Sequence, residues 1–354
     1  MIVDDSIVYR SAISQALNDV PEVEVFKAVS NGKIAIDFLK QNPDIDLITL
    51  DLEMPVMDGI ETLKNIRAFN RDVNIIVFSS FTTRGAEKTI DALSAGADDF
   101  VPKVEGGNSI EESIEMIKKE LVHKIKAFAS RTTKRSEVKK IIQQVSTAER
   151  QDTSSSLEDI VGSMTVKPKL VCIGCSTGGP EALSKIFRGL NKKPNYPILL
   201  VQHMPPMFTE KLASMLDKIS PVDVVEAKEG MKVENGMCYV APGDYHMTID
   251  KNMIVKLNQD EKVCFVRPAV DVLFESVAKN YNDQVLSIIL TGMGEDGARG
   301  CRALSDKGAY QFIQDKESSI VWGMPGAVSR TGIDVKTLTL DSFSSLLNKV
   351  TERI

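Results

Sequence analysis

The feature that most limits how this 354-residue chain can fold is a glycine-rich turn, Gly174-Cys175-Ser176-Thr177-Gly178-Gly179. The turn follows an apolar stretch over 170–173 and precedes a helical pattern that begins near Pro180. A strand, a tight turn and a helix in this order are typical of an α/β fold. Such a turn lifts the Ser176 hydroxyl clear of the sheet and directs a helix N-terminus at any negative charge that develops beside it. Ser176 is therefore a candidate nucleophile.

Length and composition indicate two domains, each large enough for a core of its own. Hydrophobic residues make up 43% and charged residues 26% of the chain, so neither a disordered nor a fibrous class is indicated. No apolar run reaches the roughly eighteen residues of a membrane helix, and the first five residues contain no basic or apolar signal segment. We expect a cytoplasmic protein without direct membrane insertion.

The chain has five cysteines, all of them after residue 170. Cys172 and Cys175 form a C-x-x-C pair, but Cys172 falls within the apolar strand and no second pair with metal-binding spacing follows. Small buried residues are favoured over a redox or zinc site, and this cysteine usage indicates a reducing compartment.

The formal net charge of −6 hides a basic segment over 118–150, where ten Lys or Arg residues stand against three Glu. A nucleic-acid surface would combine such charge with aromatic side chains, yet Phe128 is the only aromatic residue there. We interpret the segment as a solvated, partly helical linker, with docking to an acidic protein surface as the alternative. No nucleic-acid partner is expected.

Two regions of alternating strand and helix patterns flank this linker, and each predicts a parallel sheet with helices on both faces. In residues 1–128 the expected strands cover 23–29, 47–50, 75–78 and 100–101, and the expected helices cover 6–17, 32–40, 59–69, 86–95 and 109–128. Residues 129–168 are polar, without a sustained apolar face, as in a linker. Residues 169–354 predict a doubly wound, Rossmann-like sheet. Its expected strands cover 170–173, 198–202, 237–241, 253–257 and 286–290, and its helices 180–189, 209–218, 270–280 and 297–306.

Acidic residues follow expected strands of the first domain. Asp4 and Asp5 come after a short apolar start at residues 2–3, and Asp51 comes after the strand over 47–50. Because parallel strands end at one edge of a sheet, these carboxylates should converge there. Clustered carboxylates repel one another unless a cation neutralises them, and their oxygen atoms favour Mg²⁺. Ser79 and Lys103 end later strands and add a hydroxyl and a cation. This set suits transfer of a phosphoryl group to Asp51.

Residues 1–128 resemble a receiver domain of two-component response regulators, which has a flavodoxin-like fold. The resemblance becomes specific at Asp51-Leu52-Glu53-Met54-Pro55-Val56-Met57-Asp58-Gly59. The roles that it implies are Asp51 as phosphoacceptor, Asp4, Asp5 and Asp51 as Mg²⁺ ligands with the Glu53 carbonyl, and Ser79 and Lys103 as the pair that senses the phosphate.

Two features depart from the receiver pattern. Only Ile2 and Val3 precede the acidic pair, so the first strand is short or begins upstream of the given start. Val104 follows the switch lysine where the family usually has proline, and Pro102 precedes it, which puts the local loop geometry in question.

A serine nucleophile needs a base, and the chain has three histidines. His203 directly follows the expected strand over 198–202, so it lies beside Ser176 if the two strands are neighbours. We expect His203 as the base, with His246 as second choice. Asp296, in the glycine-rich loop over 290–297, is the expected third member, because a buried carboxylate there could hold the imidazole tautomer. The alternative is that Asp296 only caps the following helix.

Two related α/β classes are disfavoured. The order Ser…His…Asp differs from the Ser…Asp…His order of α/β-hydrolases. A dinucleotide site would need an acidic residue at the end of the second strand, where Gln202 and His203 stand instead, and no phosphate-binding G-x-x-x-x-G-K-[ST] motif occurs.

Residues 169–354 resemble the catalytic domain of the chemotaxis protein-glutamate methylesterases, the CheB family. The resemblance rests on the segments 173–180, 201–204, 239–243, 267–271 and 290–298, in matching order and spacing. It implies a triad of Ser176, His203 and Asp296, with oxyanion donors from the backbone near Thr177 and Met293.

The two resemblances together imply a phosphorylation-activated esterase of sensory adaptation. Its substrate would be a γ-glutamyl methyl ester on cytoplasmic helices of a methyl-accepting chemoreceptor, with glutamine deamidation accessible at the same site. The family implies that the unphosphorylated receiver covers the active site and that the histidine kinase CheA supplies the phosphoryl group. We expect a monomer that needs no cofactor for ester hydrolysis. A non-catalytic binding module and a serine esterase with another acyl substrate stay open as alternatives.

Overall fold

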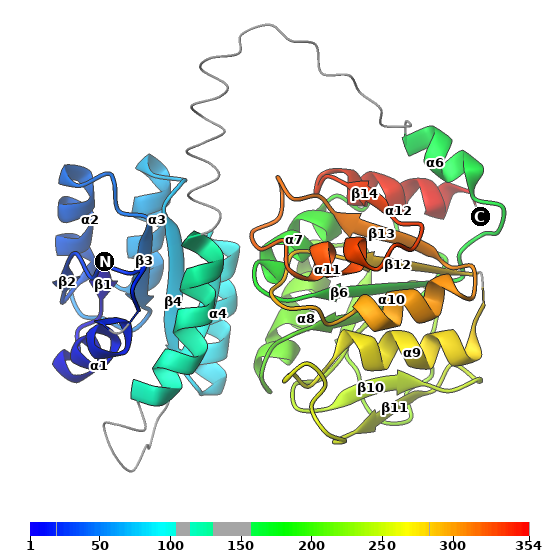
Figure 1. Cartoon of the computed structure of the whole chain (residues 1–354), viewed down its shortest axis with the longest axis horizontal. Helices are drawn as coiled ribbons and strands as arrows, with labels where there is room; N and C mark the ends of the chain where they lie inside the picture. Colours follow the sequence, from blue (N-terminus) through cyan, green and yellow to red (C-terminus); the bar gives the residue numbers. More distant parts are fainter. Residues whose placement is uncertain (19, 104–113, 130–156, 283, 354) are drawn as a thin grey trace, which may run out of the picture. The chain divides into compact units, whose positions relative to one another are not determined.

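The fold is seen in a computed structural model, which describes residues 1–18, 20–103, 114–129, 157–282 and 284–353 (Figure 1). The chain divides into two compact units, Met1–Glu149 and Arg150–Ile354. Most of the basic segment, and Val104 after the switch lysine, fall outside the described residues. None of the helices in the described ranges is long and apolar enough to span a membrane.

The first unit contains a five-stranded parallel sheet in the order β2-β1-β3-β4-β5. Its strands are β1 (Ile2–Val3), β2 (Ala28–Val29), β3 (Leu47–Asp51), β4 (Asn74–Ser80) and β5 (Asp99–Lys103). Its helices are α1 (Ile7–Asn18), α2 (Gly32–Gln41), α3 (Gly59–Phe69), α4 (Thr83–Ser94) and a helix over 114–129. The expected strand over 23–29 is reduced to β2, because most side chains before it stay at least partly exposed at the sheet edge.

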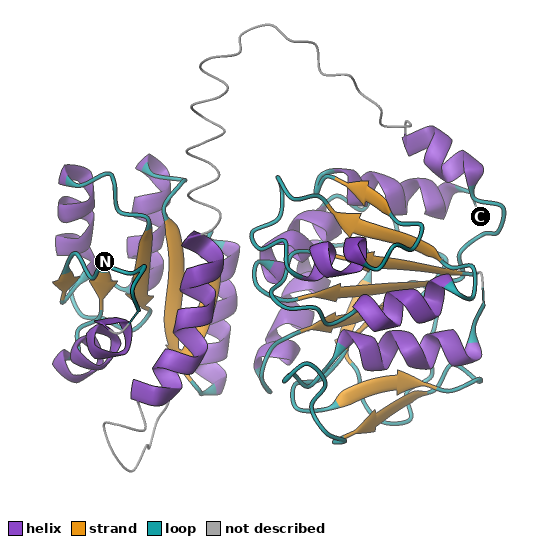
Figure 2. Ribbon diagram, in the orientation of Figure 1, coloured by secondary structure: helices purple, strands orange, loops and turns teal. Residues whose placement is uncertain are grey.

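The second unit contains a seven-stranded parallel sheet in the order β14-β13-β12-β6-β7-β9-β8 (Figure 2). Its strands are β6 (Leu170–Cys175), β7 (Ile198–Gln202), β8 (Asp223–Glu226), β9 (Met237–Val240), β12 (Val285–Ile289), β13 (Tyr310–Gln314) and β14 (Lys336–Leu338). Its helices are α6 (Leu157–Ser163), α7 (Gly179–Arg188), α8 (Phe208–Ile219), α9 (Val270–Asn280), α10 (Ala298–Ser305), α11 (Met324–Arg330) and α12 (Ser342–Glu352). The strand order reverses between β6 and β12, and a crevice outside the strand ends is expected at such a switch point.

A two-stranded hairpin stands apart from the seven-stranded sheet. The expected strand over 253–257 is present as β11 (Val255–Asn258), but it pairs antiparallel with β10 (His246–Ile249), which packs beside α9 (Figure 2). The turn between β10 and β11 is too short for the dozen or more residues that a parallel crossover needs.

The end of the expected linker belongs structurally to the second unit. Residues 157–163 form α6, which packs on the last helix, α12. Lys349 pairs with Glu158, and the Arg353 guanidinium donates to the Val161 carbonyl. These contacts and the burial of Val161 explain why a polar segment becomes helical here.

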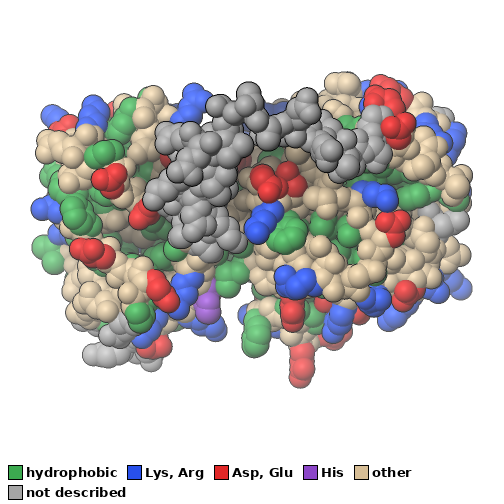
Figure 3. Space-filling view, turned by 45° about the horizontal axis from the view of Figure 1, so that its top comes forward, with side chains coloured by type: hydrophobic (Ala, Val, Ile, Leu, Met, Phe, Trp, Pro, Cys, Tyr) green, Lys and Arg blue, Asp and Glu red, His purple; other side chains and the backbone are tan. Residues whose placement is uncertain are grey.

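Charged side chains of the second unit are mixed on the face that Figure 3 draws, where Lys and Arg are interspersed with Asp and Glu. The described residues of this unit form no continuous basic stripe on that face of the kind that binds a phosphate backbone.

The core of the second unit depends on α9, and we expect Phe274→Ala to lower its free energy of unfolding by about 3–5 kcal/mol. The Phe274 side chain is fully buried, so its removal leaves a cavity. Trp322 is the single tryptophan of the chain, so its fluorescence during urea unfolding reports on this unit. Phe265→Ala is the matched control, because Phe265 is 94% exposed and its loss should change the free energy of unfolding by less than about 0.5 kcal/mol.

Candidate functional site

Ser176 and His203 stand at the ends of two adjacent strands. Strands β6 and β7 pair in parallel, and their last register pair is Cys175 with Gln202. Ser176 and His203 are the next residues of each strand, so they occupy neighbouring positions about 5 Å apart. The His203 N–H donates to the Cys175 carbonyl at 3.1 Å, which extends the ladder to this point. The structure therefore brings together the serine and the histidine that the sequence predicted.

Gln202 joins the two strand ends through its side chain. Its Nε2 donates to the carbonyls of Ser176, at 3.0 Å, and His203, at 3.2 Å. Its Oε1 accepts from the Cys175 thiol at 3.1 Å. Sequence reasoning assigned Gln202 no role, although a buried amide at the end of an apolar strand was a usable signal.

Glycine is required at two places around Ser176, one in its own turn and one in the loop after β12. Gly178 has φ 77°, in the left-handed region, where a side chain is unfavourable. Gly292, from the loop after β12, approaches Ser176 so closely that an added Cβ would lie 2.8 Å from the serine Cβ. The Ser176 N–H donates to the Thr291 carbonyl at 3.1 Å, which joins the two loops.

Two backbone donors near the serine lack protein acceptors. Within the described ranges, the N–H groups of Thr177 and Met293 make no hydrogen bond, whereas that of Ser176 is already used. Both are therefore available to a developing oxyanion, in the role that the family resemblance implies for them.

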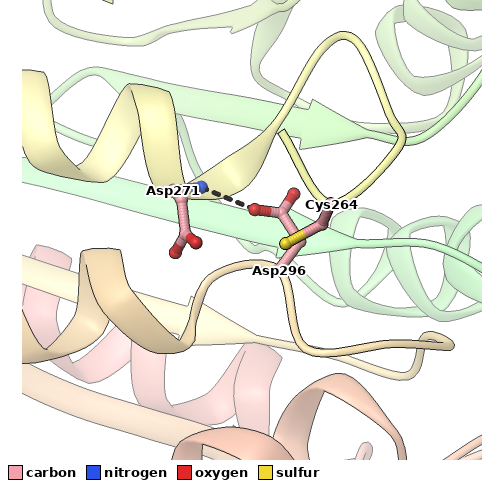
Figure 4. A group of neighbouring side chains, drawn as sticks. All are labelled: Cys264, Asp271 and Asp296. Carbon is pink, nitrogen blue, oxygen red and sulfur yellow. Dashed lines mark hydrogen bonds between the residues drawn. The ribbon is translucent and has the colours of Figure 1, made fainter. Parts of the chain in front are cut away.

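Asp296 is held by His203 and by the first backbone N–H groups of α9. The His203 Nε2 lies 2.7 Å from Asp296 Oδ2, which also accepts from the Val270 N–H at 2.6 Å. Oδ1 accepts from the Asp271 N–H at 2.9 Å, the bond drawn in Figure 4. Burial alone would raise the Asp296 pKa, but the imidazole and the two N–H groups outweigh it and lower that pKa. Asp296 is thus an ionised acceptor for His203 and for the start of α9, and its side chain makes no capping hydrogen bond to α10, the helix that it precedes.

The imidazole has one nitrogen left for a proton transfer. Because Nε2 faces Asp296, Nδ1 is the nitrogen available to the Ser176 hydroxyl. No hydrogen bond joins that hydroxyl to His203 among the described residues, and catalytic hydrogen bonds often form only in the substrate complex.

The side chain of Asp271 in turn accepts hydrogen bonds from the backbone that follows Asp296. Its Oδ1 accepts from the N–H groups of Gly297, at 2.9 Å, and Gly300, at 2.8 Å, at the start of α10. Each acid thus satisfies the N-terminus of the other's helix. Burial raises the Asp271 pKa to about 6, and nearby Asp296 adds to this rise against the opposing backbone donors. The sequence placed Asp271 in a family segment but gave it no role.

His246, the second choice as base, has both ring nitrogens committed to the backbone. Its Nε2 lies 3.0 Å from the Glu261 carbonyl and must donate to it, while Nδ1 accepts from the Ala269 N–H at 3.2 Å. The ring is fully buried and holds the segment before α9 in place. Cys172 and Cys175 are likewise buried and form no disulfide.

The first unit gathers its predicted acidic residues at the end of the sheet. Asp4, Asp5 and Asp51 each offer a carboxylate oxygen within 4.8 Å of the others. The Lys103 Nζ lies 3.0 Å from Asp4 Oδ2 and 2.7 Å from Asp51 Oδ2. Burial raises the Asp51 pKa to about 6 although Lys103 opposes this rise. Burial would lower the Lys103 pKa, but the two carboxylates raise it.

Ser79 and Glu53 make other contacts in this structure. The Ser79 hydroxyl donates to the Gly85 carbonyl at 2.8 Å rather than to Asp51. The Glu53 carboxylate pairs with Lys88 at 2.7 Å, while its N–H donates to Asp51 Oδ1 at 3.1 Å.

This acidic cluster fits a hard divalent cation. Apart from Lys103, no donor among the described residues reaches the buried oxygens Asp4 Oδ2 and Asp51 Oδ2. Three oxygen ligands of this kind suit Mg²⁺, which receiver domains use for phosphorylation.

The raised pKa of Asp271 allows its role at the N-terminus of α10 to be tested. Asp271→Asn keeps the Oδ1 acceptor but removes the ionisation. The wild-type pKa rises from 3.8 to about 6 on folding, so the folded state holds a proton that the unfolded chain releases. Wild-type stability should therefore fall relative to Asp271→Asn as the pH increases from about 4 to 6. Urea unfolding followed by Trp322 fluorescence measures this difference, and a constant difference would contradict the assignment.

Asp271→Ala is the companion variant. It leaves the N–H groups of Gly297 and Gly300 without their acceptor, so we expect a loss of about 1–3 kcal/mol of unfolding free energy even at pH 7.

Comparisons with known proteins identify the family of each unit. The family model described as CheB methylesterase matches residues 171–347, and that of the response regulator receiver domain matches residues 1–115. A protein-glutamate methylesterase/protein-glutamine glutaminase of Trichodesmium erythraeum is 40% identical over 97% of this chain and 96% of its own. A protein of the same name from a Nocardioides species is 40% identical over 96% and 92%. The solved catalytic domain of Thermotoga maritima CheB is 39% identical, covers 53% of this chain and 100% of its own, and has a TM-score of 0.49. The chain belongs to the CheB methylesterase family and carries a response regulator receiver domain before its catalytic domain.

Proposed function

We propose that this protein hydrolyses γ-glutamyl methyl esters on chemoreceptors under control of its receiver domain, and that it deamidates receptor glutamines at the same site. The observation that carries this proposal is the 2.7 Å contact between His203 and Asp296, with Ser176 at the adjacent strand position. The names of the full-length relatives support the substrate class.

In the proposed reaction, His203 Nδ1 takes the Ser176 proton as the hydroxyl oxygen attacks the ester carbonyl. Asp296 stabilises the imidazolium, and the N–H groups of Thr177 and Met293 bind the oxyanion. His203 then protonates the departing methanol, and water releases glutamate from the acyl-enzyme by the same steps in reverse. A glutamine side chain follows the same course and loses ammonia.

The receiver supplies the proposed control. Asp51 accepts a phosphoryl group from a histidine kinase, CheA in this family. Asp4, Asp5, Asp51 and the Glu53 carbonyl would hold Mg²⁺, which would supply positive charge beside the transferring group. Lys103 already bridges Asp4 and Asp51, so phosphorylation changes the partner of its ammonium. We propose that Ser79 leaves the Gly85 carbonyl and turns to the phosphoryl group, which couples Asp51 to the start of α4.

Ser176→Ala tests the nucleophile. We expect it to abolish methanol release from a methyl-labelled chemoreceptor while leaving Asp51 phosphorylation intact, because the two sites lie in separate units. Asp51→Asn is the matched control, because it keeps the serine but cannot be phosphorylated, so it should retain only the unactivated rate of methanol release. Turnover by Ser176→Ala would refute the assignment, and absent turnover in the wild type would favour the binding-module alternative.

Asp296→Asn tests the orienting carboxylate. The amide cannot accept from both backbone N–H groups and the imidazole as the carboxylate does, so the required histidine tautomer is lost. We expect kcat to fall about 10³- to 10⁴-fold. Steady-state methanol release measures it, and a fall below tenfold would show that Asp296 is only structural.

A further inference from the structure

The exposed apolar side chains of the second unit gather near the proposed triad. Of its large hydrophobic side chains in the described ranges, only Tyr245, Phe265 and Met293 are exposed, by 40%, 94% and 38%. Met293 shares a loop with Asp296. Tyr245 follows Gly243, whose backbone packs against Pro205 and Pro206 beyond His203. Isolated exposed residues are common, but a set confined to one functional edge indicates contact with a partner.

Phe265 lies at the tip of a tight turn within a segment that we name the 259–266 arm. The backbones of Val263 and Val266 exchange hydrogen bonds at 3.2 and 3.0 Å, which closes a two-residue turn. Cys264 has φ 50° and Phe265 has φ 65°, so both lie in the left-handed region. This conformation is unfavourable for residues with a Cβ and usually belongs to glycine or asparagine. Such strain tends to persist where a side chain must be presented in a fixed direction.

The base of the arm is fixed by a network of hydrogen bonds. The Arg267 guanidinium donates to the carbonyls of Gln259, at 2.7 Å, and Asp260, at 2.8 Å. The same guanidinium binds the Asp244 carboxylate at 2.6 Å, and His246 holds the Glu261 carbonyl. A rigidly mounted aromatic side chain loses little entropy on binding, which is the property of an anchoring residue.

Cys264 places the tip of the arm beside the triad. Its sulfur lies within 4.8 Å of carboxylate oxygens of both Asp271 and Asp296 (Figure 4). Partial desolvation of the thiol and these carboxylates raise the Cys264 pKa to about 11, so the thiol is a neutral neighbour of Asp296. While Cys264 faces the triad carboxylate, the next side chain, Phe265, projects into solvent. Phe265 is therefore set at a fixed offset from the reacting groups.

We infer that Phe265 is a specificity-determining residue, which anchors the protein substrate by packing against apolar side chains beside the reacting glutamyl ester on its helix. This inference rests on the proposed function. A helix can present such side chains three or four positions from the glutamyl residue, on the same face. The substrate is the expected occupant because a chain whose ester lies at Ser176 passes the edge of the triad, and Cys264 places the arm beside that edge.

The test compares a receptor ester with a small ester for the full-length, phosphorylated protein. Phe265→Ala should raise KM for the methyl-labelled receptor about 10- to 30-fold, the loss typical of an anchoring aromatic, with kcat nearly unchanged. Hydrolysis of p-nitrophenyl acetate should stay at the wild-type rate, since that ester does not reach the arm. Phe265→Trp should retain most of the affinity, and Lys262→Ala, on the same arm, should behave as wild type.

Each other outcome has a distinct meaning. An unchanged receptor KM in Phe265→Ala overturns the inference, and so does an equal loss on both esters, which would make the arm a support for the triad. Greater receptor turnover by unphosphorylated Phe265→Ala would identify the receiver as the occupant and also overturn it. A wild-type protein that cleaves p-nitrophenyl acetate but never the receptor ester refutes the proposed function, and the inference falls with it.

Discussion

The exchange of carboxylates between the N-termini of α9 and α10 is the interaction on which the proposed site depends. Asp296 precedes α10 and accepts the first N–H groups of α9, while Asp271, in the first turn of α9, accepts N–H groups of α10. Each helix end needs acceptors for its unpaired N–H groups, so the two acids cannot move independently. The position of Asp296 relative to His203 is therefore set by the packing of two helices, and a flexible loop alone could not fix it.

Asp51 and Asp296 are equally buried, yet their pKa values shift in opposite directions because their partners differ. Asp51 and Asp296 are both 2% exposed. Asp51 has Lys103 as its main partner and a second buried carboxylate nearby, and burial still raises its pKa to about 6. Asp296 has an imidazole and two helix N–H groups, which lower its pKa despite the same burial. The first arrangement leaves acceptor oxygens for a cation and a phosphoryl group, whereas the second arrangement uses its oxygens to hold a histidine.

The sequence predicted those features of the site whose pattern lies within a few consecutive residues. The turn at Ser176, the strand before His203 and the acidic residues at strand ends follow from residue type and strand periodicity, and the structure brings each set together. Other features depend on contacts between distant segments. The role of Asp271 requires α10 to lie against α9, and α6 is helical because α12 covers it. The left-handed turn at Cys264 and Phe265 contains no glycine, so the residues of the turn did not predict it.

The strand order also explains which imidazole nitrogen faces which partner. His203 follows β7, Ser176 follows the adjacent strand β6, and Asp296 comes from the loop after β12, on the far side of β6. The serine is therefore one strand spacing from the histidine backbone, about 5 Å, while the strand that leads to the aspartate is two spacings away. Nδ1 is the ring nitrogen nearer the backbone and suits the short reach, whereas Nε2 projects farther and meets Asp296 at 2.7 Å. Because Asp296 only accepts, Nε2 must carry the proton, and this leaves Nδ1 free to receive the proton of the serine.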